Sequence, residues 1–262
     1  MNSERFLGKV AVITGAANGI GLAAADRFAR EGADIVAVDL HGVSFENAAK
    51  KVKENGRHIL TVEADVSQQA DWANVIDQAL ETFGRIDILI NNAGIFGLIS
   101  RFEEIPVDSF DQVMNVNVRG MFLGMQAVIP TMRSQGGGHI VNVSSISGER
   151  GSARGTAYVT SKHAVNGLTQ CAALDVIRDG IYINAVAPAP TDTDMVRLLE
   201  NSASTRLNVD KEAARKMLED SLVIGRYGKP EEIVSAMAFL CSAEASFMTG
   251  AIVPVDGGAL AR

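Results

Sequence analysis

The sequence has little of what metal centres, disulfide frameworks and nucleic-acid grooves require. It contains 2 cysteines and 4 histidines among 262 residues, and neither set has metal-ligand spacing, so we expect no metal site. Cys171 and Cys241 lie in apolar, helix-like stretches and are predicted to be buried, reduced thiols. The formal net charge of −7 argues against nucleic acid or an anionic membrane surface as a partner, since either needs a clustered basic face.

Long apolar runs are also missing. No run approaches the roughly 18 residues of a membrane span, and residues 1–8 are polar with no apolar segment behind them. We therefore expect no signal peptide and no membrane anchor, which favours a cytoplasmic location. Hydrophobic residues make up 47% of the chain, enough for a sizeable core, and we expect a single domain over residues 1–262.

What the sequence does contain is an alternation of short β-branched runs with amphipathic stretches. This order predicts an α/β fold with a doubly wound, mostly parallel seven-stranded sheet, a Rossmann fold, and helices on both faces. Residues 188–227 form the one long connection without a regular pattern, and we expect an irregular substrate lid there. The predicted strands are Lys9–Thr14, Ala33–Asp39, His58–Asp65, Ile86–Asn91, Ile140–Ser144, Ile181–Ala187 and Ala251–Val255.

The first predicted strand runs directly into a glycine-rich turn and then a predicted helix, Gly19–Arg30. Glycines allow a tight turn and a close approach of the backbone to pyrophosphate, while the helix N-terminus supplies free N–H groups and a positive dipole. An ordinary glycine-rich turn is the alternative interpretation. The dinucleotide contacts predicted here are Gly15, Asn18, Gly19, Ile20 and Gly21.

Asp39 closes the second predicted strand, about 20 residues after the turn, where an acid can accept hydrogen bonds from the adenosine ribose hydroxyls. The same carboxylate would repel a 2′-phosphate. Neither position 18 nor the residues directly after Asp39 carry an arginine, so NAD(H) is favoured over NADP(H), with Leu40 beside the ribose. The alternative is that Asp39 only caps a helix or forms a turn.

Tyr158 and Lys162 lie four residues apart in a segment with a helical pattern, Ala157–Leu174, which places them on one helix face. An adjacent cation favours the phenolate and lowers the pKa of a tyrosine, making it a usable general acid or base. Ser145 follows a predicted strand and so falls at its carboxyl end, where open parallel sheets bind ligands. A tyrosine and a lysine at this spacing are otherwise ordinary surface residues.

These motifs, with Asp65-Val66, Asn91-Asn92-Ala93-Gly94 and Asn117-Val-Arg-Gly120, resemble those of the short-chain dehydrogenase/reductase family, in its compact single-domain branch. The resemblance covers essentially every residue from Gly8 to Gly258. It implies that Tyr158 exchanges a proton with the substrate oxygen and that Ser145, thirteen residues earlier, hydrogen-bonds the same oxygen. It also implies that Lys162 holds the nicotinamide ribose and lowers the Tyr158 pKa, and that Asn117 holds a water for proton transfer.

Further cofactor contacts follow from the same resemblance. The adenine is expected near Asp65 and Val66, the nicotinamide ribose near Asn92, Ala93 and Gly94, and the carboxamide near Pro188, Thr191 and Thr193. One departure is Ala189, where the family usually has glycine; its Cβ and the following Pro190 favour an extended backbone. The C-terminal motifs resemble those that pack across a tetramer, so a homotetramer is expected.

The resemblance implies an NAD(H)-dependent oxidoreductase acting on a secondary alcohol or ketone. Two alternatives stay open: a 3-oxoacyl-(acyl-carrier-protein) reductase, which usually favours NADP(H), and a non-catalytic dinucleotide sensor, which often lacks the tyrosine or lysine. Enoyl reductases space their Tyr and Lys more widely. Arg150 and Arg154 could clamp an anionic or polyhydroxylated substrate or be solvated loop residues. The expected pocket residues are Ile95, Phe96, Ile146, Ser147, Arg150, Arg154, Met195 and Leu198.

Overall fold

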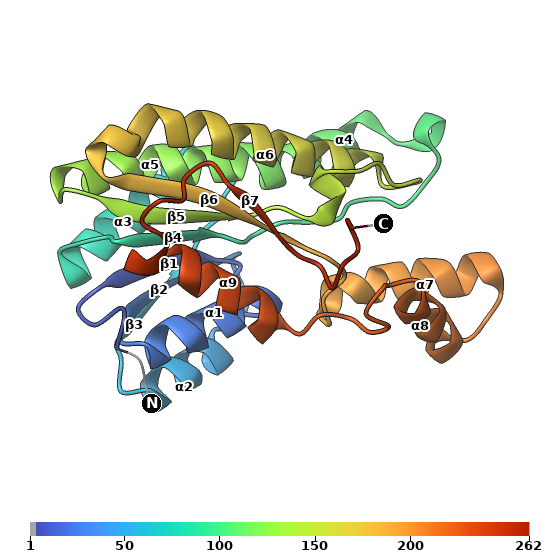
Figure 1. Cartoon of the computed structure of the whole chain (residues 1–262), viewed down its shortest axis with the longest axis horizontal. Coiled ribbons are helices and arrows are strands. Elements are labelled where there is room, and N and C mark those ends of the chain that lie inside the picture. The colour runs from blue at the N-terminus through green and yellow to red at the C-terminus, as the bar shows by residue number, and fades with distance from the viewer. Residues whose placement is uncertain (1–3, 262) are drawn as a thin grey trace.

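The computed structural model describes residues 4–261, and its centre is a seven-stranded sheet in the order β3-β2-β1-β4-β5-β6-β7 (Figure 1). Every neighbouring pair of strands is parallel. All seven predicted strands are present, and their ends lie within two residues of the predicted ones, which confirms the doubly wound Rossmann fold. The strands are β1 Val10–Thr14, β2 Asp34–Asp39, β3 Ile59–Glu63, β4 Ile88–Asn91, β5 Gly138–Val143, β6 Ile181–Pro188 and β7 Ile252–Val255.

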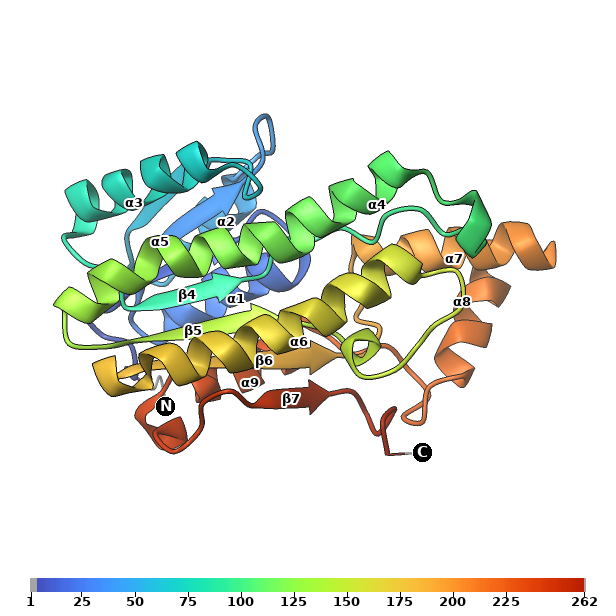
Figure 2. The ribbon, with the colours of Figure 1, turned by 90° about the horizontal axis from the view of Figure 1, so that it is seen from above.

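Helices cover both faces of the sheet (Figures 1 and 2). On β1, Ile13 packs with Phe28 and Met237 on one face, whereas its neighbour Val12 packs into the core that contains Trp72 on the other. Both faces are therefore apolar, as parallel sheets require. The first face is covered by α1 Gly19–Arg30, α2 Glu46–Glu54 and α9 Pro230–Leu240; the second by α3 Gln69–Phe83, α5 Gly120–Ser134 and α6 Thr156–Val176.

Shorter elements connect these layers. A π-helical turn, η2 (Asn115–Arg119), contains Asn117 and joins α4 (Val107–Met114) to α5. The described residues also contain four 3₁₀ turns: η1 Phe102–Glu104, η3 Ile146–Gly148, η4 Ile177–Asp179 and η5 Ala243–Ala245.

The connection over residues 188–227 differs from the irregular lid that the sequence predicted. It contains two helices, α7 (Asp194–Leu207) and α8 (Lys211–Asp220), which lie beyond the carboxyl end of the sheet (Figure 1). The start of α8 is fixed by Asp210, whose carboxylate accepts a hydrogen bond from Ala213 N at 2.7 Å, a capping signal that the sequence analysis overlooked.

The segments directly before α7 and after α8 are hydrogen-bonded to each other. Asp192 N donates to Gly228 O at 2.8 Å and Gly228 N donates to Pro190 O at 3.0 Å. The Asp192 carboxylate also accepts from Arg197 on α7 and, at 3.2 Å, from Arg215 on α8. Because one carboxylate bridges both helices, α7 and α8 form one unit, which we call the lid.

The cysteine prediction is half right. Cys241 is buried, but Cys171 is exposed, because it lies on the outer side of α6, which also exposes Leu174. Within residues 4–261, no three His, Cys, Asp or Glu side chains gather as a metal site could require. The same part of the chain contains no helix with the length and apolarity needed to cross a bilayer.

Candidate active site

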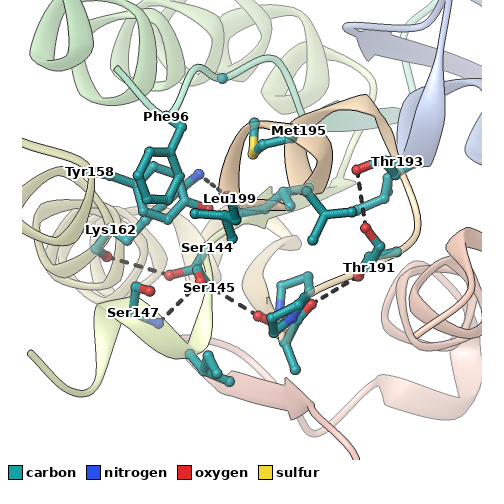
Figure 3. Close-up of a pocket in the computed structure, with 18 of the residues that line it drawn as sticks. Phe96, Ser144, Ser145, Ser147, Tyr158, Lys162, Thr191, Thr193, Met195 and Leu199 are labelled. Carbon is teal, nitrogen blue, oxygen red and sulfur yellow. Dashed lines mark hydrogen bonds between the residues drawn. The ribbon is translucent and has the colours of Figure 1, made fainter. Parts of the chain in front are cut away.

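A cavity of about 620 Å³ opens where β1, β4, β5 and β6 end and where the lid begins (Figure 3). Residues that lie far apart in the sequence meet there because the strands are parallel and their carboxyl ends share one edge of the sheet. Most of the predicted site residues line this cavity. They are Gly15, Asn18, Gly19, Ile20, Asp39, Asn92, Ala93, Gly94, Ser145, Tyr158, Lys162, Pro188, Thr191 and Thr193.

The glycine turn at one end of the cavity has the backbone that only glycine adopts readily. Gly15 has a φ of +63°, and a Cβ on Gly21 would lie 2.0 Å from Gly15 O, so both positions exclude larger residues. The turn is braced from β4: Asn92 Nδ2 donates to Thr14 O at 2.9 Å, and Ala93 N donates to Thr14 Oγ1 at 3.0 Å.

Asp39 lies at the end of β2, on the rim of the same turn. Its carboxylate accepts hydrogen bonds from Ala17 N at 3.0 Å and from Leu40 N at 2.9 Å. These bonds orient the carboxylate. The first N–H groups of α1 have no intrahelical partner, and the Asn18 side chain does not cap them. A carboxylate beside a glycine turn with free N–H groups fits a dinucleotide with an unphosphorylated ribose.

Five predicted site residues do not line the cavity: Gly21, Leu40, Asp65, Val66 and Asn117. Gly21 packs behind Gly15, and Leu40 is exposed next to Asp39. The Asp65 carboxylate accepts from Ser67 N at 2.9 Å, so it holds the turn after β3.

Ser145 follows β5 by two residues, as predicted for a residue at the carboxyl end of that strand. Its Oγ accepts from Ser147 N at 3.1 Å and donates to Pro188 O at 3.5 Å, and Ser145 lowers the pKa of the Tyr158 hydroxyl. The neighbouring Ser144 is directed elsewhere: its Oγ donates to Asn166 Oδ1 on α6 at 2.6 Å.

Asn166 connects the segment around Ser145 to α6. Its Nδ2 donates to Gly148 O at 2.9 Å, so one amide binds both Ser144, directly before Ser145, and Gly148, three residues after it. Gly148 packs closely against α6, where an added Cβ would lie 2.8 Å from Lys162 O. These contacts, which no sequence motif indicates, hold the segment around Ser145 against α6.

Tyr158 and Lys162 are both buried on α6. Burial raises the pKa of Tyr158, and the hydrogen bond with Ser145 offsets part of that rise. Burial also lowers the pKa of Lys162 to about 8. Lys162 Nζ donates to Val143 O at 2.8 Å, and its effect on the Tyr158 pKa stays a prediction; burial is the larger of the two influences on that pKa here.

The Asn117 side chain is fully buried, and its amide already forms hydrogen bonds within the protein. Its Nδ2 donates to Ile95 O at 2.9 Å and Ser161 Oγ at 3.0 Å, and its Oδ1 accepts from Ile95 N at 2.8 Å. A Cβ on Gly94 would lie 3.1 Å from Asn117 Oδ1 and 3.7 Å from Lys162 Nζ. Gly94 therefore leaves open the space between these two atoms.

Apolar side chains from three segments surround the cavity beyond Tyr158. The Phe96 ring stacks on the Tyr158 ring with centroids 4.6 Å apart and an interplanar angle of 21°, and Met195 and Leu199 face it from the lid (Figure 3). Phe96, Ile146, Ser147, Arg150 and Met195 line the cavity as predicted.

Three expected pocket residues do not line it: Ile95, Arg154 and Leu198. The backbone of Ile95 is bonded to Asn117, and Arg154 has a φ of +66°. Leu199 replaces Leu198 because α7 is a helix, in which residues four apart, such as Met195 and Leu199, share a face. The prediction of an irregular connection over residues 188–227 did not take the helical spacing of Met195 and Leu199 into account.

Ala189 accommodates its side chain without strain. It lines the cavity and its N donates to Val255 O at 3.3 Å. Within residues 4–261 the only non-glycine residues with positive φ are Arg154 and Asn208. Ala189 therefore has an ordinary φ, and a glycine is not required here.

Comparisons with known proteins agree with this geometry. Residues 15–259 match a family model described as enoyl-(acyl carrier protein) reductase. The chain is 40% identical to levodione reductase of Leifsonia aquatica, over 98% of this chain and 96% of the relative. It is 37% identical to a 3-oxoacyl-[acyl-carrier-protein] reductase of Thermotoga maritima, over 97% of this chain and 98% of the relative.

Two solved structures with NAD in their descriptions are also similar. Xylitol dehydrogenase bound to NAD⁺ superposes with a TM-score of 0.91 at 35% identity, covering 97% of this chain and 100% of that one. Carveol dehydrogenase of Mycobacterium avium in complex with NAD gives a TM-score of 0.93 at 30% identity, covering 98% and 99% of the two chains.

Proposed function

The chain belongs to the short-chain dehydrogenase/reductase family, and on that premise we propose that it is an NAD(H)-dependent oxidoreductase acting on a secondary alcohol or ketone. One observation carries the proposal. Ser145, Tyr158 and Lys162 share one cavity with the glycine turn and Asp39, so a proton-transferring group and a dinucleotide cradle meet in the same space.

Tyr158 is the proposed general acid and base. NAD(H) supplies the hydride acceptor or donor when bound. The buried phenol, protonated at neutral pH because burial raises its pKa, gives its proton to the oxygen of a ketone during reduction and takes it back from an alcohol during oxidation. Ser145, which lowers the pKa of the Tyr158 hydroxyl, hydrogen-bonds the same substrate oxygen and fixes its position.

Lys162 and Asn117 are proposed to complete the site. With a pKa near 8, Lys162 can exchange protons close to neutral pH and can hold the ribose hydroxyls next to Tyr158. Asn117 acts first as a positioning residue, since both of its N–H groups are used by Ile95 and Ser161. A water in its proton relay has to bind Oδ1 or the main chain, in the space beside Gly94.

NAD(H) is the proposed cofactor, and Asp39 is the main support. The carboxylate is held at the rim of the glycine turn, where it can accept from ribose hydroxyls and would repel a 2′-phosphate. The names of two similar structures, NAD⁺-bound xylitol dehydrogenase and carveol dehydrogenase with NAD, point the same way. Leu40, Asp65 and Val66 stay in the proposed adenosine site, outside the cavity itself.

We further propose a single domain with a lid over residues 188–227, a homotetramer and a cytoplasmic location. Met195 and Leu199 line the cavity from α7, which supports substrate contact by the lid. Phe122 on α5, Leu174 on α6 and Phe247 before β7 are large apolar side chains left exposed, as expected at subunit contacts. Light scattering after gel filtration measures the oligomeric state.

Two other functions remain as alternatives. A relative is named 3-oxoacyl-[acyl-carrier-protein] reductase, but Asp39 disfavours the NADP(H) that such enzymes usually use. A non-catalytic sensor would not need the buried Tyr158 and Lys162 that this chain retains.

The test is turnover of NAD(H) with a panel of secondary alcohols and small ketones, followed by absorbance at the nicotinamide band. We expect turnover with at least one substrate and a preference for NAD(H). Tight NADH binding without turnover on any substrate would favour the sensor.

A further inference from the structure

Arg150 is a cation that the proposed chemistry does not use. Two cationic side chains line the cavity within residues 4–261, Lys162 and Arg150. Lys162 is buried below Tyr158. Arg150 lies at the exposed rim and forms no ion pair with any carboxylate of the described chain; its Nη1 donates to Ala259 O at 3.2 Å.

The position of Arg150 separates it from the proposed cofactor site. Its partner Ala259 follows β7, the last strand of the sheet, whereas the glycine turn follows β1 and Asp39 ends β2. Four strand spacings separate β1 from β7 in this order, a distance of roughly 19 Å. Arg150 is therefore on the side of the cavity away from the pyrophosphate and the adenosine ribose.

Apolar side chains also line the cavity that Arg150 shares with Tyr158. Phe96, Met195, Leu199 and Leu222 line it, together with the small polar residues Ser147 and Ser152. A guanidinium has five N–H donors in a planar fork, and the bond to Ala259 O uses one. That bond anchors the side chain at the rim while leaving donors for a ligand. Apart from Lys162, Arg150 is the only cationic side chain that lines the cavity within residues 4–261, so it is the charged donor available to a substrate whose reacting carbon lies at Tyr158.

Resting on the proposed function, we propose that Arg150 determines specificity for small ketones and secondary alcohols that carry a second oxygen acceptor. This acceptor, a carbonyl or a carboxylate at the end of the molecule away from the reacting carbon, receives hydrogen bonds from the guanidinium. A monofunctional ketone leaves those donors to water and gains nothing from Arg150. The substrate class is therefore doubly oxygenated, with an apolar skeleton between the two oxygens.

Arg154 provides a matched control. It lies in the same loop, four residues later, carries the same charge and does not line the cavity. The test compares wild type, Arg150→Met, Arg150→Lys and Arg154→Met with NADH and three ketones: cyclohexanone, 1,4-cyclohexanedione and 4-oxocyclohexanecarboxylate. The readout is kcat/KM for each doubly oxygenated ketone divided by kcat/KM for cyclohexanone, so general losses of activity cancel.

We expect wild type to prefer at least one doubly oxygenated ketone, and Arg150→Met to lower that ratio about tenfold, mainly through KM, as loss of one charged hydrogen-bond donor implies. Arg154→Met keeps the wild-type ratio. Arg150→Lys retains a preference for the carboxylate, because the charge remains, but loses it for the dione. The two doubly oxygenated ketones thus distinguish an anionic from a neutral acceptor.

Equal ratios in wild type, Arg150→Met and Arg154→Met would overturn the role of Arg150 while leaving the proposed oxidoreductase function intact. Wild-type preference for cyclohexanone over both other ketones would overturn it as well. If no ketone is turned over, the same ratios are read from calorimetric dissociation constants on the protein–NADH complex. An unchanged binding ratio there contradicts the role of Arg150, and missing turnover separately contradicts the proposed function.

Discussion

Lys162 and Tyr158 are desolvated together: the Lys162 ammonium lies 5.4 Å from the centre of the Tyr158 ring and donates to Val143 O at 2.8 Å. Burial moves the pKa of the phenol up and that of the ammonium down, to about 8. The two pKa values, nearly equal in water, are thereby moved apart, so below pH 8 the ammonium is a buried charge without a carboxylate partner among residues 4–261.

Lys162→Met should show this conflict between stability and function. Below pH 8 the folded protein must bury an ammonium, which disfavours folding. As pH rises from about 8 toward the unfolded-state pKa of roughly 10.4, the unfolded state binds more protons, so wild-type stability rises. The variant lacks that rise. We therefore compare the Tm of the variant minus the Tm of wild type at two pH values. This difference should be larger at pH 7 than at pH 10 by at least about 2 °C, the change in Tm that roughly 1 kcal/mol produces.

The measurement is calorimetric Tm against pH for wild type, Lys162→Met and Lys53→Met, which changes an exposed lysine on α2. Lys53→Met should follow wild type. A Tm difference between Lys162→Met and wild type that does not vary with pH would mean that burial does not lower the pKa of Lys162 in the folded state.

Asp39→Ser should move the cofactor preference toward NADP(H), and adding Leu40→Arg should move it further. The substitution removes an acceptor for ribose hydroxyls and a charge that repels a 2′-phosphate. Loss of a hydrogen bond to a charged group, about 1.5–3 kcal/mol, corresponds to roughly tenfold to hundredfold in kcat/KM for NAD. Since Asp39 also accepts from Ala17 N, both cofactors lose some affinity, so the ratio of kcat/KM for NAD over NADP is measured.

Asp34→Ser is the control, because Asp34 starts the same strand and pairs with Arg57 instead. It should change stability without changing the cofactor ratio. If wild type already prefers NADP, or if Asp39→Ser leaves the ratio unchanged, Asp39 is only a turn residue and the cofactor assignment is wrong.

Asn166→Leu should impair chemistry without removing any group that touches the reactants. The amide binds Ser144 and Gly148 on either side of Ser145, so its loss frees the serine from α6. We expect kcat to fall about tenfold, an effect of misplacement, while the dissociation constant for NADH stays within about twofold of wild type. Asn166→Gln, which keeps both kinds of hydrogen bond, should recover part of kcat.

The matched control is Gln170→Leu, one helical turn further on α6 and exposed. All variants are assayed well below their Tm so that partial unfolding does not contribute. Unchanged kcat in Asn166→Leu, or an equal fall in Gln170→Leu, would contradict a positioning role for Asn166.

Much of the fold could be predicted because parallel strands buried on both faces are β-branched runs, as in β1 and β6. The same logic predicts which ends meet: Asp39, Asn92 and Ser145 each follow a strand, and parallel strands end at one edge. The shared cavity therefore follows from strand order, without any knowledge of side-chain contacts.

The wrong predictions of pocket residues have two causes: contacts between distant segments that the sequence does not show, and the helices that were not predicted in residues 188–227. The lid helices α7 and α8 carry few buried residues and little apolar sequence, so the segment resembles a loop. Leu198 was consequently predicted in place of Leu199. Arg150 and Arg154 are indistinguishable in sequence; only the path of the loop, with its positive φ at Arg154, separates them.

Tyr158→Phe tests the central claim most directly, because it removes the exchangeable proton with little change in volume and keeps the ring that stacks on Phe96. With NADH and a ketone that wild type reduces, we expect kcat to fall by about 10² or more, while NADH binding measured by fluorescence is unchanged. Tyr182→Phe, on β6 and stacked on His139, should keep wild-type kcat. Retention of most activity in Tyr158→Phe would contradict the account.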